Sequence, residues 1–165
     1  MQLNPYAKFL DGRDPIPVLT STSERLHTLI APLSGSQVNI PPAAGKWSIC
    51  NIVTHLADTE LVFAFRLRQT LAADPGQPHH IIQPFDQDVW AQRYAVYHIE
   101  PALALFEAIR NWNLLFLATV SEEDRHRPAT HPERGTMTLW TIVETMAGHD
   151  LNHIQQIGRL AARIT

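Results

Sequence analysis

Two histidines near the end of the chain have the spacing of metal ligands on a helix. His149 and His153 are four residues apart, so on an α-helix their side chains lie on the same side, about one turn from each other. A metal ion needs such convergence, because two imidazole nitrogens must each come within about 2.0–2.1 Å of it. Hydrogen-bonded core histidines or an exposed pair would have the same spacing, so the pair alone leaves these readings open.

This pair interrupts an apolar stripe. His149, Asp150 and His153 lie between apolar residues that recur at helical spacing before and after them; these are Leu139, Val143, Met146, Ile157, Leu160 and Ile164. The two histidines are therefore expected on or beside the inward face of the helix. Buried imidazoles without partners cost free energy, and a bound metal ion would satisfy both. The other histidines, apart from His55, lie in polar or proline-rich surroundings typical of solvated loops.

His55 is the third candidate ligand. It follows Ile52 by three residues and precedes Leu56, so it is expected near the inward face of its own helix. If that helix and the last one run parallel, a modest stagger brings His55 level with His149 and His153. Three histidines without a fourth protein ligand are typical of a reactive metal site, which keeps a position for water or substrate. We expect one divalent ion; imidazole suits zinc, nickel, manganese and iron, and the three histidines do not choose among them.

Polar neighbours of these histidines are candidates to orient a ring or to hold a bound water. They are Asp58 and Thr59 on the helix of His55, and Asn152 and Gln156 beside His153. An ordinary polar position near a helix surface explains each of them equally well. Asp58 is also the candidate for a catalytic base. Asp150 adjoins His149 but points about 100° away from it, so it ranks lower.

Several other side chains could take part in chemistry, but a structural role is favoured for most. Glu60 is expected to be solvated, and Arg66 to extend along the surface, although it could hold an anionic substrate. Cys50 lies among apolar residues and is expected to be buried and inert rather than nucleophilic. The tryptophans are expected in the core or in a pocket wall, with Trp90 favoured for the pocket; the others are Trp47, Trp112 and Trp140.

Four segments have the periodicity of amphipathic helices. They cover about residues 17–33, 48–73, 101–120 and 138–164. Ser48 is a good N-cap for the second, and the third has an apolar stripe at Leu105, Ile109, Trp112, Phe116 and Val120. Long connections follow the second and third helices, and the first of these connections contains a short helix near residues 88–95. We find no strand alternation, so the sequence predicts an all-α four-helix bundle, as a single domain over residues 1–165.

Bulk composition fits this picture. The chain has 165 residues, of which 45% are apolar, which is enough to form a hydrophobic core. Its formal net charge is −3, so a nucleic-acid partner is not expected. A single cysteine excludes an internal disulfide. No basic-then-apolar leader is visible, and no stretch approaches the roughly 20 apolar residues that span a bilayer. We therefore expect a soluble cytoplasmic protein without a membrane partner.

Two stretches resemble a known family. GKWSICNIVTHLADTE is similar to the opening of the second helix in the DinB-like superfamily, and GTMTLWTIVETMAGHDLNHIQQIGRL is similar to its last helix. The phrase QPFDQDVW in the middle connection is also similar. This resemblance implies a four-helix bundle, often a homodimer, with a metal site at His55, His149 and His153.

The resemblance leaves the reaction open. Members include transferases that use a low-molecular-weight thiol such as bacillithiol or mycothiol, a mycothiol-dependent isomerase, and proteins described as metal-dependent hydrolases. The family name refers to DNA damage induction and does not imply DNA binding. We expect first a thiol-dependent S-transferase that acts on small electrophiles. The alternatives are a hydrolase that uses metal-activated water, with Asp58 as base, and a non-catalytic metal-binding module.

Overall fold

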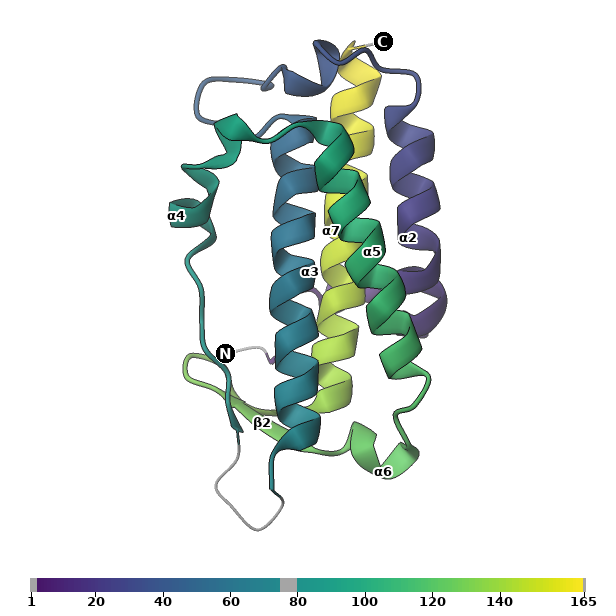
Figure 1. The fold of residues 1–165 in the computed structure, drawn as a ribbon, viewed down its shortest axis with the longest axis vertical. Coiled ribbons are helices and arrows are strands. Elements are labelled where there is room, and N and C mark those ends of the chain that lie inside the picture. The colour runs from purple at the N-terminus through teal and green to yellow at the C-terminus, as the bar shows by residue number, and fades with distance from the viewer. Residues whose placement is uncertain (1–2, 75–79, 165) are drawn as a thin grey trace.

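The main body of the protein is a bundle of four long helices, as Figure 1 shows for the computed structural model. The structure describes residues 3–74 and 80–164. The predicted helices agree with the observed ones within a few residues, and the predicted fold class is confirmed. The bundle helices are α2 (Pro15–Ile30), α3 (Ile49–Ala72), α5 (Ile99–Leu117) and α7 (Leu139–Ile164).

Short helices lie at the ends of the bundle and in its connections. The short helix predicted near residues 88–95 is present as α4, followed by a turn of 3₁₀ helix, η2. Among the described residues, none of the helices is long and apolar enough to cross a membrane. The short elements are α1 (Ala7–Leu10), η1 (Gln37–Asn39), α4 (Gln87–Ala91), η2 (Tyr94–Val96) and α6 (Glu122–Arg125).

The helix directions explain the long connections. In Figure 1, α2 and α7 run upward, whereas α3 and α5 run downward. The parallel arrangement of α3 and α7 that the sequence argument assumed is therefore wrong, because these two helices are antiparallel. Two consecutive long helices that are parallel, α3 and α5, need a connection that returns along the whole bundle. The connection from α3 to α5 supplies that return, and the structure describes residues 73–74 and 80–98 of it.

A small sheet lies at the end of the bundle where α3 finishes and α7 begins (Figure 1). Its strands are β1 (His80–Ile81), β2 (Pro128–His131) and β3 (Gly135–Thr138); β1 pairs with β2 in parallel, and β2 with β3 antiparallel. The prediction of no strands is wrong. Segments of two to four residues are too short to show alternation, and β1 finds its partner far along the chain.

The start of α3 follows from its capping residues. The Ser48 hydroxyl accepts a hydrogen bond from the backbone N–H of Asn51, and the Asn51 side chain accepts one from the backbone N–H of Ser48. This capping box satisfies two amide donors that a helix start leaves free, and its Ser48 is the N-cap that the sequence predicted. It fixes the beginning of α3, and therefore places His55 on the second turn.

The inward face of α5 differs from the predicted one. Leu105 and Trp112, which the apolar stripe placed inside, are 43% and 66% exposed. Phe106, Arg110 and Asn113 are buried instead. The stripe was misread because the true inward face includes a charged and an amide side chain, which a search for apolar periodicity counts as solvent-facing.

Arg110 is buried at the centre of an ion-pair network. Its Nε and Nη2 donate to the Glu60 carboxylate at 3.0 and 2.8 Å, and its Nη1 donates to Asp150 at 2.7 Å and to the Leu19 carbonyl at 2.9 Å. These contacts reach α2, α3 and α7 from α5. Glu60 was expected in solvent, but it is only 1% exposed.

Neutral groups complete the network. The Thr22 hydroxyl donates to Asp150 at 2.8 Å, and the Asn113 amide donates to Glu60 at 2.8 Å. Burial alone would lower the pKa of Arg110, but the carboxylates of Asp150 and Glu60 raise it above its ordinary value. The guanidinium therefore stays charged, and all four long helices meet in one hydrogen-bonded cluster.

We predict that Arg110→Met destabilises the protein by about 3–5 kcal/mol, because it leaves two buried carboxylates without their cation. Urea denaturation measures the loss in unfolding free energy. Arg159→Met on the exposed surface of α7 is the matched control, and its expected effect is within about 0.5 kcal/mol. Similar stabilities for the two variants would contradict the role given to this network.

Candidate metal centre

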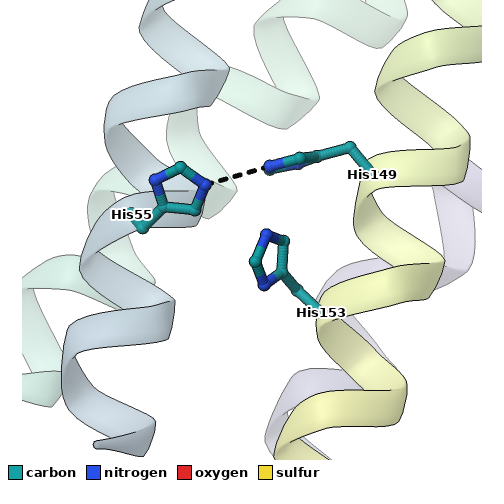
Figure 2. Close-up of side chains that lie close together, drawn as sticks. All are labelled: His55, His149 and His153. Atoms are coloured by element: carbon teal, nitrogen blue, oxygen red, sulfur yellow. Dashed lines mark hydrogen bonds between the residues drawn. The ribbon is translucent and has the colours of Figure 1, made fainter. Parts of the chain in front are cut away.

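Three histidines meet between α3 and α7 (Figure 2). His55 comes from α3, and His149 and His153 come from neighbouring turns of α7, with the rings gathered at one point. The Nε2 atoms of His55 and His149 are 3.0 Å apart, and one nitrogen from each ring lies within 4.8 Å of the others. Two nitrogen ligands of a tetrahedral ion lie roughly 3.3 Å apart, so these rings need only small shifts to share one ion.

All three rings are buried and neutral. His55, His149 and His153 are 1%, 4% and 6% exposed. Burial, with repulsion from His153, lowers the pKa of His55 to about 3, and burial lowers that of His149 well below its ordinary value. Burial also lowers the pKa of His153, against the opposing effects of Gln156 and Asp150. Neutral imidazole is the form that binds a metal ion.

Gln156 orients the ring of His153. Its side-chain carbonyl oxygen lies 3.0 Å from His153 Nδ1, and a carbonyl can only accept, so Nδ1 carries the proton. The lone pair of His153 is then on Nε2, as in metal sites where an outer group fixes the tautomer. His55 Nδ1 is buried without a hydrogen-bond partner in the described part of the chain. This donor set, three convergent neutral imidazoles, fits a divalent transition-metal ion.

Aromatic rings surround the three histidines. The Trp47 ring lies 4.8 Å from that of His55, centroid to centroid, and the Tyr6 ring meets His149 edge-on at 5.1 Å. Phe63 lies 6.1 Å from His149. These apolar neighbours keep water from the sides of the rings, which accounts for the low pKa values.

A cavity of about 280 Å³ gives access to the site. Its lining includes His55, His149 and Thr59 of the predicted set, and the Thr59 hydroxyl donates to the His55 carbonyl at 2.8 Å. The cavity continues past the middle connection and the β2–β3 hairpin, to residues that sequence reasoning did not assign to the site. These are Tyr6, Val62, Phe63, Arg66, Pro84, Phe85, Gln87, His131, Glu133, Arg134 and Thr145.

Two of these residues correct earlier expectations. His131 was placed with the solvated loop histidines, but it is 4% exposed. Arg66 was expected to extend along the surface, but it is half-buried in the cavity wall. His131 lies on a strand that the sequence analysis did not predict, so the local sequence held no signal for it. Arg66 is on the predicted helix α3, and the sequence had already offered it as a residue that could hold an anionic substrate.

The remaining predicted residues lie outside this cavity lining. Asp58 is half-buried and accepts a hydrogen bond from the Tyr94 hydroxyl at 2.9 Å; burial raises its pKa, and this bond opposes the rise. Asn152 is half-buried on α7. The ring centroids of Trp90 and Phe85 are 4.8 Å apart. Trp90 lines a neighbouring, more apolar groove with Leu61 and Phe65.

Comparisons with known proteins identify the family of this chain and agree with its fold. The family model of the DinB superfamily matches residues 19–157. A protein of Oceanobacillus iheyensis, named as a candidate metal-dependent hydrolase, is 29% identical over 139 residues, which cover 84% of this chain and 78% of that protein. A protein of Geobacillus kaustophilus with the same description is 28% identical over 142 residues, which cover 84% of this chain and 77% of that protein.

A solved structure is also similar. YfiT from Bacillus subtilis, described as a probable metal-dependent hydrolase with an unusual four-helix bundle topology, superposes with a TM-score of 0.81. The two share 24% sequence identity, and the match covers 90% of this chain and 85% of that one. At this level of identity, the similarity supports the fold alone.

Gly148 allows the N-terminal segment to cover the site. A Cβ atom at Gly148 would lie 2.6 Å from the backbone oxygen of Tyr6 and 2.8 Å from its Cβ. No side chain fits in that space. The absence of a side chain therefore lets Tyr6 approach α7 closely enough to pack against His149.

We predict opposite effects for two glycine-to-alanine changes on α7. Gly148→Ala should lower the unfolding free energy by about 1–3 kcal/mol, because overpacking displaces the Tyr6 backbone. Gly158→Ala should be neutral or stabilising by up to about 1 kcal/mol, because its Cβ would meet only Leu29 at 3.8 Å. Urea denaturation of both variants measures the difference. Equal stabilities would show that Tyr6 does not pack as described.

Proposed function

The chain belongs to the DinB superfamily, and from this membership and its three convergent imidazoles we propose that it is a metal-dependent enzyme that transfers a low-molecular-weight thiol to a small electrophile. The observation that carries the proposal is the set of buried, neutral His55, His149 and His153 beside an accessible cavity. Three protein ligands next to a cavity are the arrangement of catalytic rather than structural zinc sites.

The side chains around the site have distinct roles in this proposal. His55, His149 and His153 hold the ion, which when bound supplies the Lewis acidity that lowers the pKa of a thiol or water. Gln156 holds the His153 ring in its ligating tautomer. Trp47, Tyr6 and Phe63 exclude water. On the resemblance to the family, we further propose zinc or nickel as the ion and a homodimer as the assembled form.

The position of Asp58 favours thiol transfer over hydrolysis. Hydrolysis needs a base beside the reacting water, but Asp58 is bonded to Tyr94 and does not line the cavity. A thiolate is a sufficient nucleophile without such a base. The transfer forms a carbon–sulfur bond, displaces the leaving group with its bonding electrons and releases the thiol proton to solvent.

Hydrolysis is the second candidate, because the similar proteins carry that description. In this chain Glu133 lines the cavity and offers a carboxylate. A non-catalytic metal-binding module is disfavoured, because Pro84, Phe85 and Gln87 of the middle connection line a cavity that reaches His55 and His149. A module that only bound metal would not need such an opening.

We predict that the zinc- or nickel-loaded protein conjugates a thiol to monochlorobimane. Bacillithiol, mycothiol, cysteine and coenzyme A are screened, and fluorescence reports the product. Chelation should reduce the rate by at least about 100-fold and metal should restore it, because Lewis acidity generates the nucleophile. His149→Ala should have the same effect as chelation.

Asp58→Asn and Glu133→Gln together separate the two reactions, because Glu133 is the carboxylate that lines the cavity. Under the transfer mechanism the rates of both variants stay close to that of the native protein, whereas loss of a general base would cost about 10²–10⁴-fold. Product formed from an ester or amide without any thiol would favour hydrolysis. A fully metal-loaded protein that conjugates none of these thiols would contradict the transferase proposal.

A further inference from the structure

The cavity that reaches the metal centre has a basic region nearer the sheet. Arg66 lies on α3, three turns beyond His55 and so roughly 16 Å along the helix axis. His131 ends β2, and Arg134 lies in the turn that follows it. These three side chains line the same cavity as His55 and His149, so one small molecule could contact both regions.

The two arginines are not neutralised by the protein. Within residues 3–74 and 80–164, neither Arg66 nor Arg134 forms an ion pair. Arg66 Nη2 donates to the Gln83 carbonyl at 3.1 Å, but its buried Nε has no acceptor in the same part of the chain. Burial, and then repulsion from Arg134, lowers the pKa of Arg66 to about 10. Two cationic groups held near each other in this way attract and bind an anion.

His131 adds a third donor. The backbone N–H of Glu133 donates to His131 Nδ1 at 3.2 Å, so the neutral ring carries its proton on Nε2. Burial, Arg134 and Arg66 together lower the pKa of His131, with Glu133 opposing them. The ring is therefore a neutral N–H donor beside two guanidinium groups.

Glu133 is the one carboxylate that the described residues contribute to the cavity lining, and it does not cancel this charge. It is exposed, and it forms no ion pair with Arg66 or Arg134. Two arginines against one glutamate leave the lining positive, although the whole chain has a formal charge of −3. The local excess of positive charge is thus a property of this cavity and not of the protein as a whole.

We propose that Arg66, Arg134 and His131 bind an anionic oxygen group, a carboxylate or a phosphate, on the substrate whose other end reaches His55 and His149 of the metal centre. Guanidinium forks bind such groups through paired, charge-assisted hydrogen bonds. The cavity of about 280 Å³ restricts the ligand to a small molecule. This assignment rests on the proposed function, because it specifies the substrate class of the same site.

Calorimetric titration of the 165-residue chain tests this subsite. The probes are succinate, inorganic phosphate and succinamide, which is the neutral counterpart of succinate; the metal content of each sample is measured in parallel. At least one anion should bind tenfold or more tightly than succinamide, and its affinity should fall as salt screens the charges. The stronger of the two anions identifies the group as carboxylate or phosphate.

Substitutions locate the binding. Arg66→Gln and Arg134→Gln should each weaken anion binding about tenfold or more, since a charge-assisted hydrogen bond contributes roughly that factor. Arg134→Lys keeps the positive charge but loses the paired N–H donors of the guanidinium group. Its affinity for the anion should lie between those of Arg134→Gln and the native protein. Arg159→Gln, an exposed arginine on α7, should have no effect. Circular dichroism checks that each variant is folded.

The outcomes separate this proposal from the metal site. Anion binding that depends on Arg66 and Arg134, in a protein whose three histidines take up neither zinc nor nickel when these are supplied, would support the subsite and contradict the proposed function. A metal-loaded protein that binds neither anion at about 10 mM, the range of weak ligands, would overturn the subsite alone. Binding of both anions no tighter than that of succinamide, or native-like anion binding by both glutamine variants, would overturn it as well.

Discussion

The bundle depends on one buried cation, the guanidinium of Arg110, because it is bonded to groups on all of the other three long helices. Its partner Glu60 lies five residues after His55 on α3, and its partner Asp150 adjoins His149 on α7. The network therefore fixes the stretches of α3 and α7 that carry the metal-centre histidines. A buried pair of this kind loses much of its Coulomb gain to desolvation, so its clearest effect is to specify how the helices align.

The helix directions then determine how the site is reached. Because α3 and α5 are parallel, the chain must return along the bundle, and the returning connection supplies Pro84 and Phe85 to the cavity wall (Figure 1). The same connection pairs through β1 with the hairpin that carries His131 and Arg134. The cavity therefore owes both of its ends to this topology and to the small sheet. One end reaches the histidines of the metal centre, and the other end is basic.

Periodicity and side-chain chemistry predicted the parts of this structure that are local. The stripe of α7, the Ser48 cap and the inward position of His55 all follow from spacing within one helix. Glu60 and Arg110 were missed because each occupies an inward position that apolar periodicity assigns to solvent, and only their pairing makes burial tolerable. Arg66, His131 and Arg134 could not be grouped, since they lie on segments that meet only through strands too short to recognise.

The central claim is that the imidazoles of His55, His149 and His153 bind one divalent ion. X-ray absorption spectroscopy of the zinc-loaded protein tests it most directly. The expected shell holds three imidazole nitrogens at about 2.0–2.1 Å and one further oxygen or nitrogen ligand, and it is reduced to two imidazoles in His55→Ala. A zinc shell that contains sulfur from Cys50, or one unchanged in His55→Ala, would contradict it.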